Sequence, residues 1–160
     1  MLRLGRMNYL QLQLILQNLL IKYNYMELNI RRLKETDWDT LVSWWSTWPE
    51  WENPPQDFLP DNGKGGFMVE KNNTPIVAGF LYLTNSKGVL LEWIVSNPEY
   101  RDKDRKQAIE LLINGAENVS KKLGYKYMFT IGRNKHLIDI HKKLNWKVDK
   151  KPSYEIIKNI

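Results

Sequence analysis

The chain has 160 residues, of which 42% are hydrophobic and 26% charged, a balance typical of one compact globular domain. This balance excludes a disordered, collagenous or wholly membrane-embedded protein. The absence of cysteine excludes disulfides and thiolate chemistry and agrees with a reducing, cytoplasmic compartment. The two histidines, His136 and His141, have no metal-binding spacing, so we expect no metal site.

The net charge of +6 raises the question of a nucleic-acid partner, but its distribution argues against one. Half of the excess lies in residues 1–25, which hold three basic residues and no acidic one. The surplus that remains is too small for a dedicated phosphate-binding protein unless the charges cluster on one face. The candidate cluster is 101–106 with Lys121 and Lys122. Without stacking aromatics or a helix-turn-helix signal, we rank nucleic acid last among the partners.

Residues 1–25 differ in composition from the rest of the chain. Their apolar positions have helical spacing, but scattered Gln and Asn residues exclude a membrane span, and a small-residue cleavage site is lacking. One interpretation is an amphipathic helix that docks on the domain, a partner or a membrane surface. The other, which we favour, is translated spacer ahead of a natural start at Met26. The folded domain is expected to cover residues 26–160.

Hydrophobic periodicity predicts a mixed α/β domain. A capping box of Thr36 and Asp39 opens a helix whose apolar face includes Leu41 and Trp45 and which runs to Pro49. A long proline-rich connection follows, then a meander of antiparallel strands, then a strand–helix–strand crossover. The expected strands are 28–33, 66–71, 76–84, 89–96, 127–131, 146–149 and 154–158, and the other expected helices are 104–123 and 135–144.

Turn residues mark boundaries between these elements. Residues 72–75 (NNTP) have the composition of a hairpin turn between the first two strands of the meander. Gly124 is expected to end the long helix, because glycine readily adopts the left-handed conformation of a helix C-terminus.

Residues 134–146 (NKHLIDIHKKLNW) carry the most specific pattern in the chain. They resemble the C-terminal pattern of the GNAT superfamily of acyl-CoA-dependent N-acetyltransferases: Asn, an apolar helix face, then Tyr-x-Lys-Leu-Gly-Phe. His141 stands at the tyrosine position, Asn145 at the glycine and Trp146 at the phenylalanine. Because asparagine also adopts the left-handed conformation, the turn after the helix is expected to survive the exchange.

Residues 95–108 (VSNPEYRDKDRKQA) are similar to the family's fourth strand and its pyrophosphate loop. In the family this loop has the pattern Arg/Gln-x-x-Gly-x-Gly/Ala. Its backbone amides, at the start of a helix, bind the phosphates. Arg101 matches, whereas Asp104 and Lys106 occupy the glycine positions. A carboxylate there is expected to repel the pyrophosphate unless the neighbouring basic side chains compensate.

The resemblance covers residues 26–160 and implies a mixed, mainly antiparallel sheet of six to seven strands flanked by helices. It also implies acetyl-CoA as co-substrate. For Asn134, an N-cap at the head of the last helix is an equally good interpretation. The implied cofactor contacts are Val95, Ser96, Arg101, Lys103, Asp104, Arg105, Lys106, Gln107 and Asn134.

The resemblance implies direct transfer, in which a base takes a proton from an amine and an acid protonates the leaving thiolate. His141 is the candidate acid, since an imidazole titrates near neutral pH. The alternative is a packed histidine bonded to one backbone carbonyl. Glu92 is the candidate base, because burial beside a tryptophan would raise its pKa. The alternative is a strand glutamate paired with a nearby Lys or Arg.

Five tryptophans lie within fourteen residues, on the first helix and the loop after it, where the family usually lines the acceptor site. Trp48, Trp51 and Glu52 are the candidate contacts to a cationic amine, with Trp51 the preferred one. The alternative places Trp44, Trp45 and Trp48 in the core and the acidic residues on a solvated rim.

These residues support two functions of different kinds. The first is an N-acetyltransferase that transfers an acetyl group from acetyl-CoA to a primary amine of a small molecule or protein. The second is a GNAT-fold binding or structural protein that has lost acetyl-CoA binding along with the loop glycines.

Overall fold

The computed structural model describes residues 27–49 and 52–160. Its five strands form one sheet in the order β1-β2-β3-β4-β5. Neighbouring strands are antiparallel except for β4 and β5, which are parallel. The strands are β1 (Leu28–Arg32), β2 (Gly66–Lys71), β3 (Thr74–Leu83), β4 (Gly88–Ser96) and β5 (Tyr127–Phe129). The helices are α2 (Trp38–Trp45), α3 (Arg105–Lys122) and α4 (Lys135–Lys143), with 3-10 turns η2 (Glu35–Asp37) and η3 (Gln56–Phe58).

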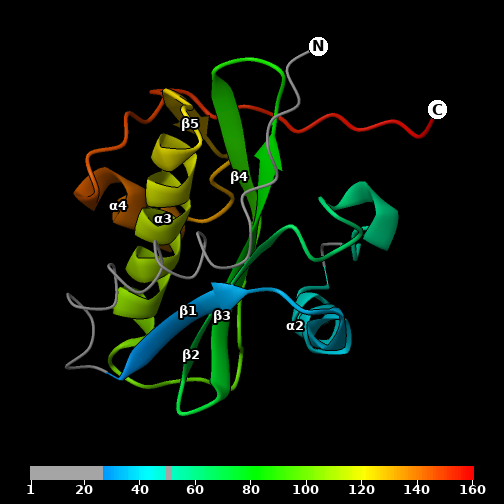
Figure 1. The fold of residues 1–160 in the computed structure, drawn as a ribbon, viewed down its shortest axis with the longest axis vertical. Coiled ribbons are helices and arrows are strands. Elements are labelled where there is room, and N and C mark those ends of the chain that lie inside the picture. The colour runs from blue at the N-terminus through cyan, green and yellow to red at the C-terminus, as the bar shows by residue number, and fades with distance from the viewer. Residues whose placement is uncertain (1–26, 50–51) are drawn as a thin grey trace.

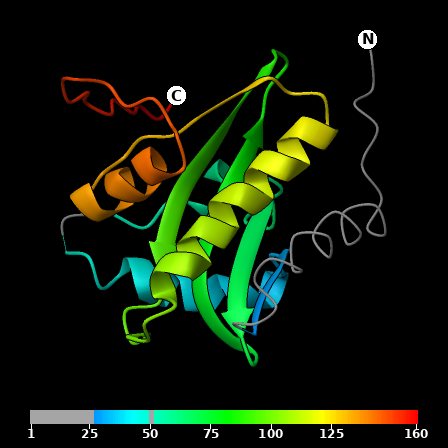
Figure 2. The same ribbon diagram turned by 90° about the vertical axis from the view of Figure 1, so that its left-hand side faces the viewer.

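The sheet separates two layers of helices. In Figure 1, α3 and α4 lie to one side of the strands and α2 to the other. Figure 2 shows α3 crossing the first of these faces. Strand alternation fills both layers, since successive side chains point to opposite faces. Along β2, Phe67 and Val69 join the core beneath α3, whereas Met68 joins the core beneath α2.

The core beneath α2 is rich in aromatic rings. Trp45 is 1% exposed and its ring packs against Phe80 and, edge-on, against Trp38 and Trp93. Trp44 is also buried. The structure therefore confirms the core interpretation for Trp44 and Trp45, and α2 is anchored to the sheet through these rings.

An ion-pair network fixes the start of α2 to the edge of the sheet. Arg31 on β1 donates two hydrogen bonds to the Asp37 carboxylate, at 2.8 and 2.9 Å, and a third at 2.8 Å to Glu70 on β2. Asp37 also accepts a hydrogen bond from the backbone N–H of Lys34. Burial alone would raise the pKa of Asp37, but these hydrogen bonds hold it below its ordinary value. Asp37, rather than the predicted Thr36–Asp39 box, thus supports the start of this helical segment.

A β-bulge lies in the middle of β4. Glu92 pairs with Phe80 and Val95 with Ala78, so two residues of β4 oppose the single Gly79 of β3. The extra residue is accommodated at Trp93, whose φ of 56° is left-handed. A bulge bends its strand and increases its twist. The parallel pairing with β5 is confined to Gly88–Leu90, before the bulge.

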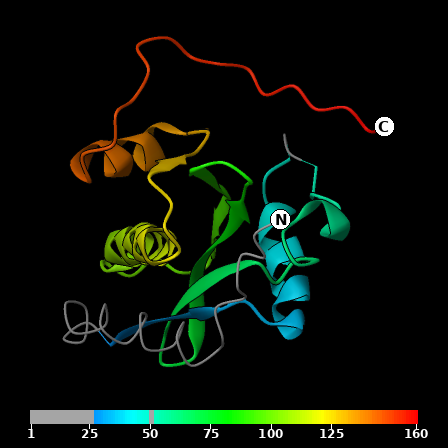
Figure 3. The same cartoon turned by 45° about the horizontal axis from the view of Figure 1, so that its top comes forward.

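The prediction of six to seven strands is wrong, since the described chain forms five. The expected closing strands 146–149 and 154–158 do not form. A strand needs a neighbouring backbone, and β5, which would supply it, is only three residues long. Side chains anchor this segment instead: the Trp146 indole donates to Glu117, and Glu155 pairs with Arg133. Figure 3 shows the segment crossing one end of the sheet from α4 toward the side of α2.

The predicted N-terminal amphipathic helix, or spacer, lies outside the described residues. In the part of the chain that the structure describes, no helix is both long and apolar enough to cross a bilayer.

Candidate functional site

A cleft opens where β4 and β5 separate, after their last paired residues Leu90 and Phe129. Glu92 lies opposite Phe80 in the strand pairing, so its side chain is on the α2 face of the sheet. Its Oε1 accepts a hydrogen bond of 2.8 Å from the backbone N–H of Ile131. The carboxylate is therefore held by the backbone on the other side of the cleft. The cleft is lined by Glu92, Trp93, Ile94, Thr130, Ile131, Arg133, Asn134 and Leu137.

Glu92 has the electrostatic properties of a base that works near neutral pH. Its exposure is only 9%, and burial raises its pKa from 4.5 to about 7. The Ile131 hydrogen bond and the positive charge of Arg133 oppose this rise, whereas the negative charge of Glu155 adds to it. The alternative for Glu92 was an ion pair with a nearby Lys or Arg. Among the described residues, no such pair to Glu92 is seen.

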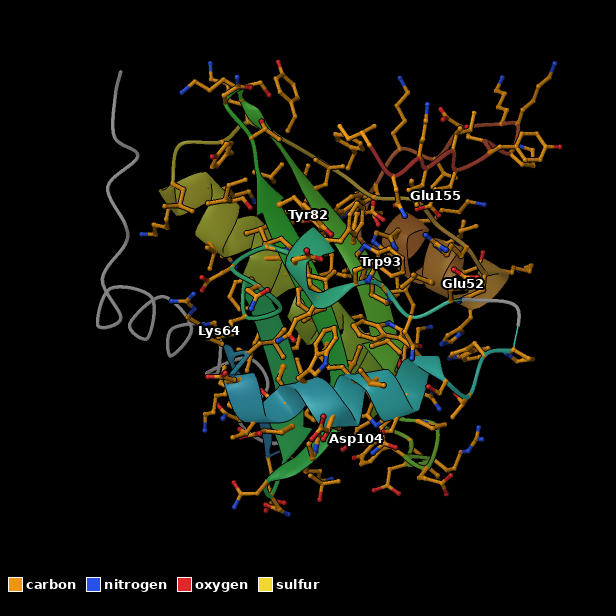
Figure 4. The ribbon with its side chains drawn as sticks, turned by 90° about the vertical axis from the view of Figure 1, so that its right-hand side faces the viewer. Glu52, Lys64, Tyr82, Trp93, Asp104 and Glu155 are labelled. Atoms are coloured by element: carbon orange, nitrogen blue, oxygen red, sulfur yellow. The ribbon has the colours of Figure 1, made fainter. Side chains whose placement is uncertain are left out.

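Aromatic side chains form one wall beside Glu92. The Phe58 ring meets Trp93 edge-on at 6.0 Å and Tyr82 at 6.4 Å between centroids. The Tyr82 hydroxyl donates to the Phe58 carbonyl. Burial, together with the negative charges of Glu92 and Glu155, raises the pKa of Tyr82 to about 12, so the phenol stays protonated. Figure 4 looks onto this face, and Tyr82, Trp93 and Glu155 lie in the same part of it.

The N-terminus of α3 has an unusual arrangement of charge. Asp104, at a position where the family has glycine, makes no side-chain cap hydrogen bond to the helix. Its carboxylate instead pairs with Lys71 at 2.8 Å and accepts the Tyr100 hydroxyl at 2.7 Å. Burial alone would raise the pKa of Asp104, but these two partners hold it below its ordinary value. The carboxylate is thus neutralised by Lys71 instead of capping the helix N–H groups.

Two guanidinium groups stand together at this helix terminus. Burial lowers the pKa of Arg105, and the positive charge of Arg101 lowers it further. Gln107, in the first turn, has a buried side-chain oxygen without a hydrogen-bond partner. The first N–H groups of an α-helix have no intrahelical acceptor. The unpaired Gln107 oxygen is an acceptor and does not itself favour an anion, and the Arg105 guanidinium donates a hydrogen bond to the Tyr100 carbonyl. The two positive charges, together with the N–H groups of a helix start, are the features that bind a phosphate anion.

The other residues assigned to cofactor contact lie along the same path. Val95 and Ser96 end β4, and the Val95 side chain is buried, so only its backbone can contact a ligand. Lys103 and Lys106 are exposed beside the helix start. Asn134 begins α4, where its Oδ1 accepts the N–H of Leu137 at 2.8 Å, which confirms the N-cap interpretation.

His141 on α4 is buried, at 3% exposure, and packs edge-on against Trp146. Its Nδ1 is 2.8 Å from the carbonyl oxygen of Leu137, an acceptor, so Nδ1 carries the hydrogen. Nε2 is buried without a partner. Burial lowers the pKa of His141, so the ring is neutral near pH 7. It does not line the cleft that contains Glu92 but the neighbouring groove between α4 and the C-terminal segment.

The predicted acceptor residues of the first loop are not joined to Glu92 by any described contact. Trp51 lies outside the described residues. Trp48 is 48% exposed, which is against the core interpretation for this ring, and Glu52 is exposed.

Sequence reasoning missed the aromatic wall and the Arg133–Glu155 pair. Strand alternation could have placed Tyr82 on the face of Phe80, two residues earlier. Trp93 reaches this face only because of the bulge, and nothing in the local sequence indicates a tryptophan at positive φ. Arg133 and Glu155 are 22 residues apart and meet only through the path of the C-terminal segment.

The sequence matches no family model and no curated protein. Solved structures similar to the fold are acetyltransferases of low sequence identity. An aminoglycoside acetyltransferase from an uncultured soil metagenomic sample is 13% identical, with a TM-score of 0.58 over 84% of this chain and 98% of that one. A ribosomal-protein-alanine N-acetyltransferase from Brucella melitensis is 14% identical, with a TM-score of 0.56 over 82% and 99%.

A third similar structure is N-acetylglutamate synthase from Neisseria gonorrhoeae, complexed with coenzyme A and N-acetyl-glutamate. It is 12% identical, with a TM-score of 0.59, and the match covers 72% of this chain and 27% of that one. The chain therefore shares the fold of these structures, which is the GNAT fold that the sequence resemblance implies.

Proposed function

We propose that the protein is an N-acetyltransferase that moves an acetyl group from acetyl-CoA to a primary amine by direct attack. The observation that carries this proposal is Glu92, a buried carboxylate in the β4–β5 cleft whose pKa is raised to about 7. An alkylammonium must lose a proton before its nitrogen can attack, and a base with a pKa near the working pH does this best.

The residues present suit acetyl-CoA despite the missing glycines. Arg101 and Arg105 supply positive charge for the pyrophosphate, and the first N–H groups of α3 supply donors. Asp104 does not oppose binding as a free carboxylate would, because Lys71 neutralises it. Val95 and Ser96 offer backbone groups between this helix and the cleft.

Acetyl-CoA, when bound, supplies an acyl carbon to which the amine nitrogen bonds as the carbon–sulfur bond breaks. Glu92 accepts the proton that the amine releases and keeps its position through the Ile131 hydrogen bond. Trp93 and Tyr82 exclude water from one side of the carboxylate, which maintains its raised pKa.

His141 is the proposed donor of the proton that the leaving thiolate takes up. The neutral ring has its one hydrogen on Nδ1, bonded to Leu137, so Nε2 can donate only from the imidazolium form, which the lowered pKa makes a minor form near pH 7. If Nε2 donates the proton, His141→Phe lowers kcat by at least about tenfold. A role in packing alone would change the melting temperature and leave kcat within about twofold, so both quantities should be measured on the same variant.

Acetyl-CoA binding to the full-length chain is the direct test of the cofactor site. Calorimetric titration is expected to show binding that the Arg101→Ala, Arg105→Ala double variant weakens at least about tenfold, because hydrogen bonds to charged groups are each worth about 1.5–3 kcal/mol. The matched control is Lys121→Ala, Lys122→Ala, which removes the same charge from the other end of α3. No binding at millimolar acetyl-CoA would reject the enzyme and leave the alternative, a GNAT-fold binding protein.

A further inference from the structure

The mouth of the Glu92 cleft already contains a bound cation, supplied by the protein itself. The Arg133 guanidinium carbon lies 5.1 Å from the centroid of the Trp93 ring. The same guanidinium pairs with the carboxylate of Glu155 from the C-terminal segment. An aromatic face and a carboxylate that together hold a cation form the kind of site that recognises ammonium groups.

Glu155 acts electrostatically on the groups of the cleft. Its negative charge contributes to the raised pKa of Glu92 and to that of Tyr82. Arg133 lines the same cleft as Glu92 and Trp93 and pairs with Glu155, so the Arg133–Glu155 pair lies beside the Glu92 cleft. Phe58 extends the aromatic wall through its edge-on contacts to Tyr82 and Trp93.

Arg133 is placed so that a ligand can replace it. The side chains of Arg133 and Glu155 are 26% and 28% exposed. Separating them therefore leaves neither charge buried and unpaired, the situation that makes fully buried ion pairs costly to break. A ligand ammonium on Glu155 and Trp93 would restore both interactions, while the guanidinium moves to water.

We propose that Glu155 and Trp93 bind the second positive charge of a small aliphatic diamine or polyamine whose first amino group reacts beside Glu92. This inference rests on the proposed acetyltransferase function and specifies its acceptor. Arg133 occupies the second-cation site when no acceptor is bound. The acceptor exchanges with Arg133 on Glu155, so the two compete for one carboxylate.

The test compares 1,3-diaminopropane with n-propylamine, which has the same carbon chain and one charge fewer. The wild-type protein is expected to prefer the diamine in kcat/KM. Glu155→Gln is expected to lower kcat/KM for the diamine about tenfold, the loss typical of a hydrogen bond to a charged group, and to change that for propylamine less than threefold. Asp149→Asn, an exposed acid of the same segment, is the matched control and should change neither value.

Binding is measured separately by tryptophan fluorescence, so that the acceptor site and the enzyme activity are tested independently. Diamine affinity should fall about tenfold in Glu155→Gln and rise in Arg133→Gln, which removes the internal competitor. Diamine binding with these two opposite shifts, but without turnover, would reject the acetyltransferase and keep the cation site. Equal affinity for both amines, or the same loss for both in Glu155→Gln, would overturn the inference.

Discussion

Replacing Glu92 by Gln is expected to lower kcat by about 10²–10⁴-fold, the usual contribution of a positioned general base. Glutamine has nearly the same shape, and its side-chain oxygen can still accept the Ile131 N–H, so the cleft should keep its geometry. What is lost is the site that receives the proton of the attacking amine. Steady-state kinetics with a diamine acceptor measures the effect.

The pH dependence gives a second readout of the same residue. A base must be deprotonated, so the wild-type kcat/KM is expected to rise with pH through about 7, the pKa of Glu92, and then level off. Glu92→Gln should lose this rise. Glu99→Gln, an exposed acid in the loop before α3, is the control and should keep both the rate and the profile. A Glu92→Gln variant with wild-type kcat would assign proton removal to another group.

The same shift has a consequence for stability. A carboxyl whose pKa is about 7 in the folded state and 4.5 in the unfolded state binds more protons when folded, so stability falls as pH rises through this window. Glu92→Gln removes this pH-dependent loss of folding stability. The variant is therefore expected to be more stable than wild type at pH 8, and its advantage should shrink toward pH 4.5.

The regular parts of the fold followed from sequence because their signals are local. The apolar stripe of 104–123 became the helix Arg105–Lys122, and Gly124 ends it at a φ of 84°. Asn145, expected to replace the family glycine, has a φ of 66°, and Asn72 and Asn73 turn the β2–β3 hairpin at 49° and 62°. Each of these outcomes depends on neighbours within a few residues.

The features that decide chemistry depended on contacts between distant residues. The sequence predicted that Asp104 would repel a pyrophosphate, whereas Lys71, 33 residues earlier, neutralises it. The closing strands failed because an alternating pattern does not form a strand without a partner edge. The cation site could not be predicted, since it joins β4, η3, the loop before α4 and the C-terminal segment.

Helix α2 packs on the sheet face that carries Glu92, Tyr82 and Trp93, and the Arg31 network that fixes α2 can be tested by stability. Arg31→Met is expected to lower the free energy of unfolding by about 3 kcal/mol, because removing one partner of a buried ion pair leaves its charges uncompensated. The side chains concerned, Arg31, Asp37 and Glu70, are only 16%, 10% and 12% exposed. In a chain of this size the loss corresponds to a fall in melting temperature of about 10 °C.

Arg32→Met is the matched control, since the two arginines are consecutive residues of β1. Arg32 pairs with Asp61 at 3.6 Å, and these side chains are 40% and 61% exposed. Exposed pairs contribute about 0–1 kcal/mol, so this variant should unfold close to wild type. The difference in free energy of unfolding between wild type and Arg31→Met should also become smaller as pH falls below 3.8, the ordinary pKa of Asp37. Protonation of the Asp37 carboxylate then removes the negative charge that Arg31 balances. Equal destabilisation by both variants would mean that strand packing, and not this ion-pair network, holds α2 against the sheet.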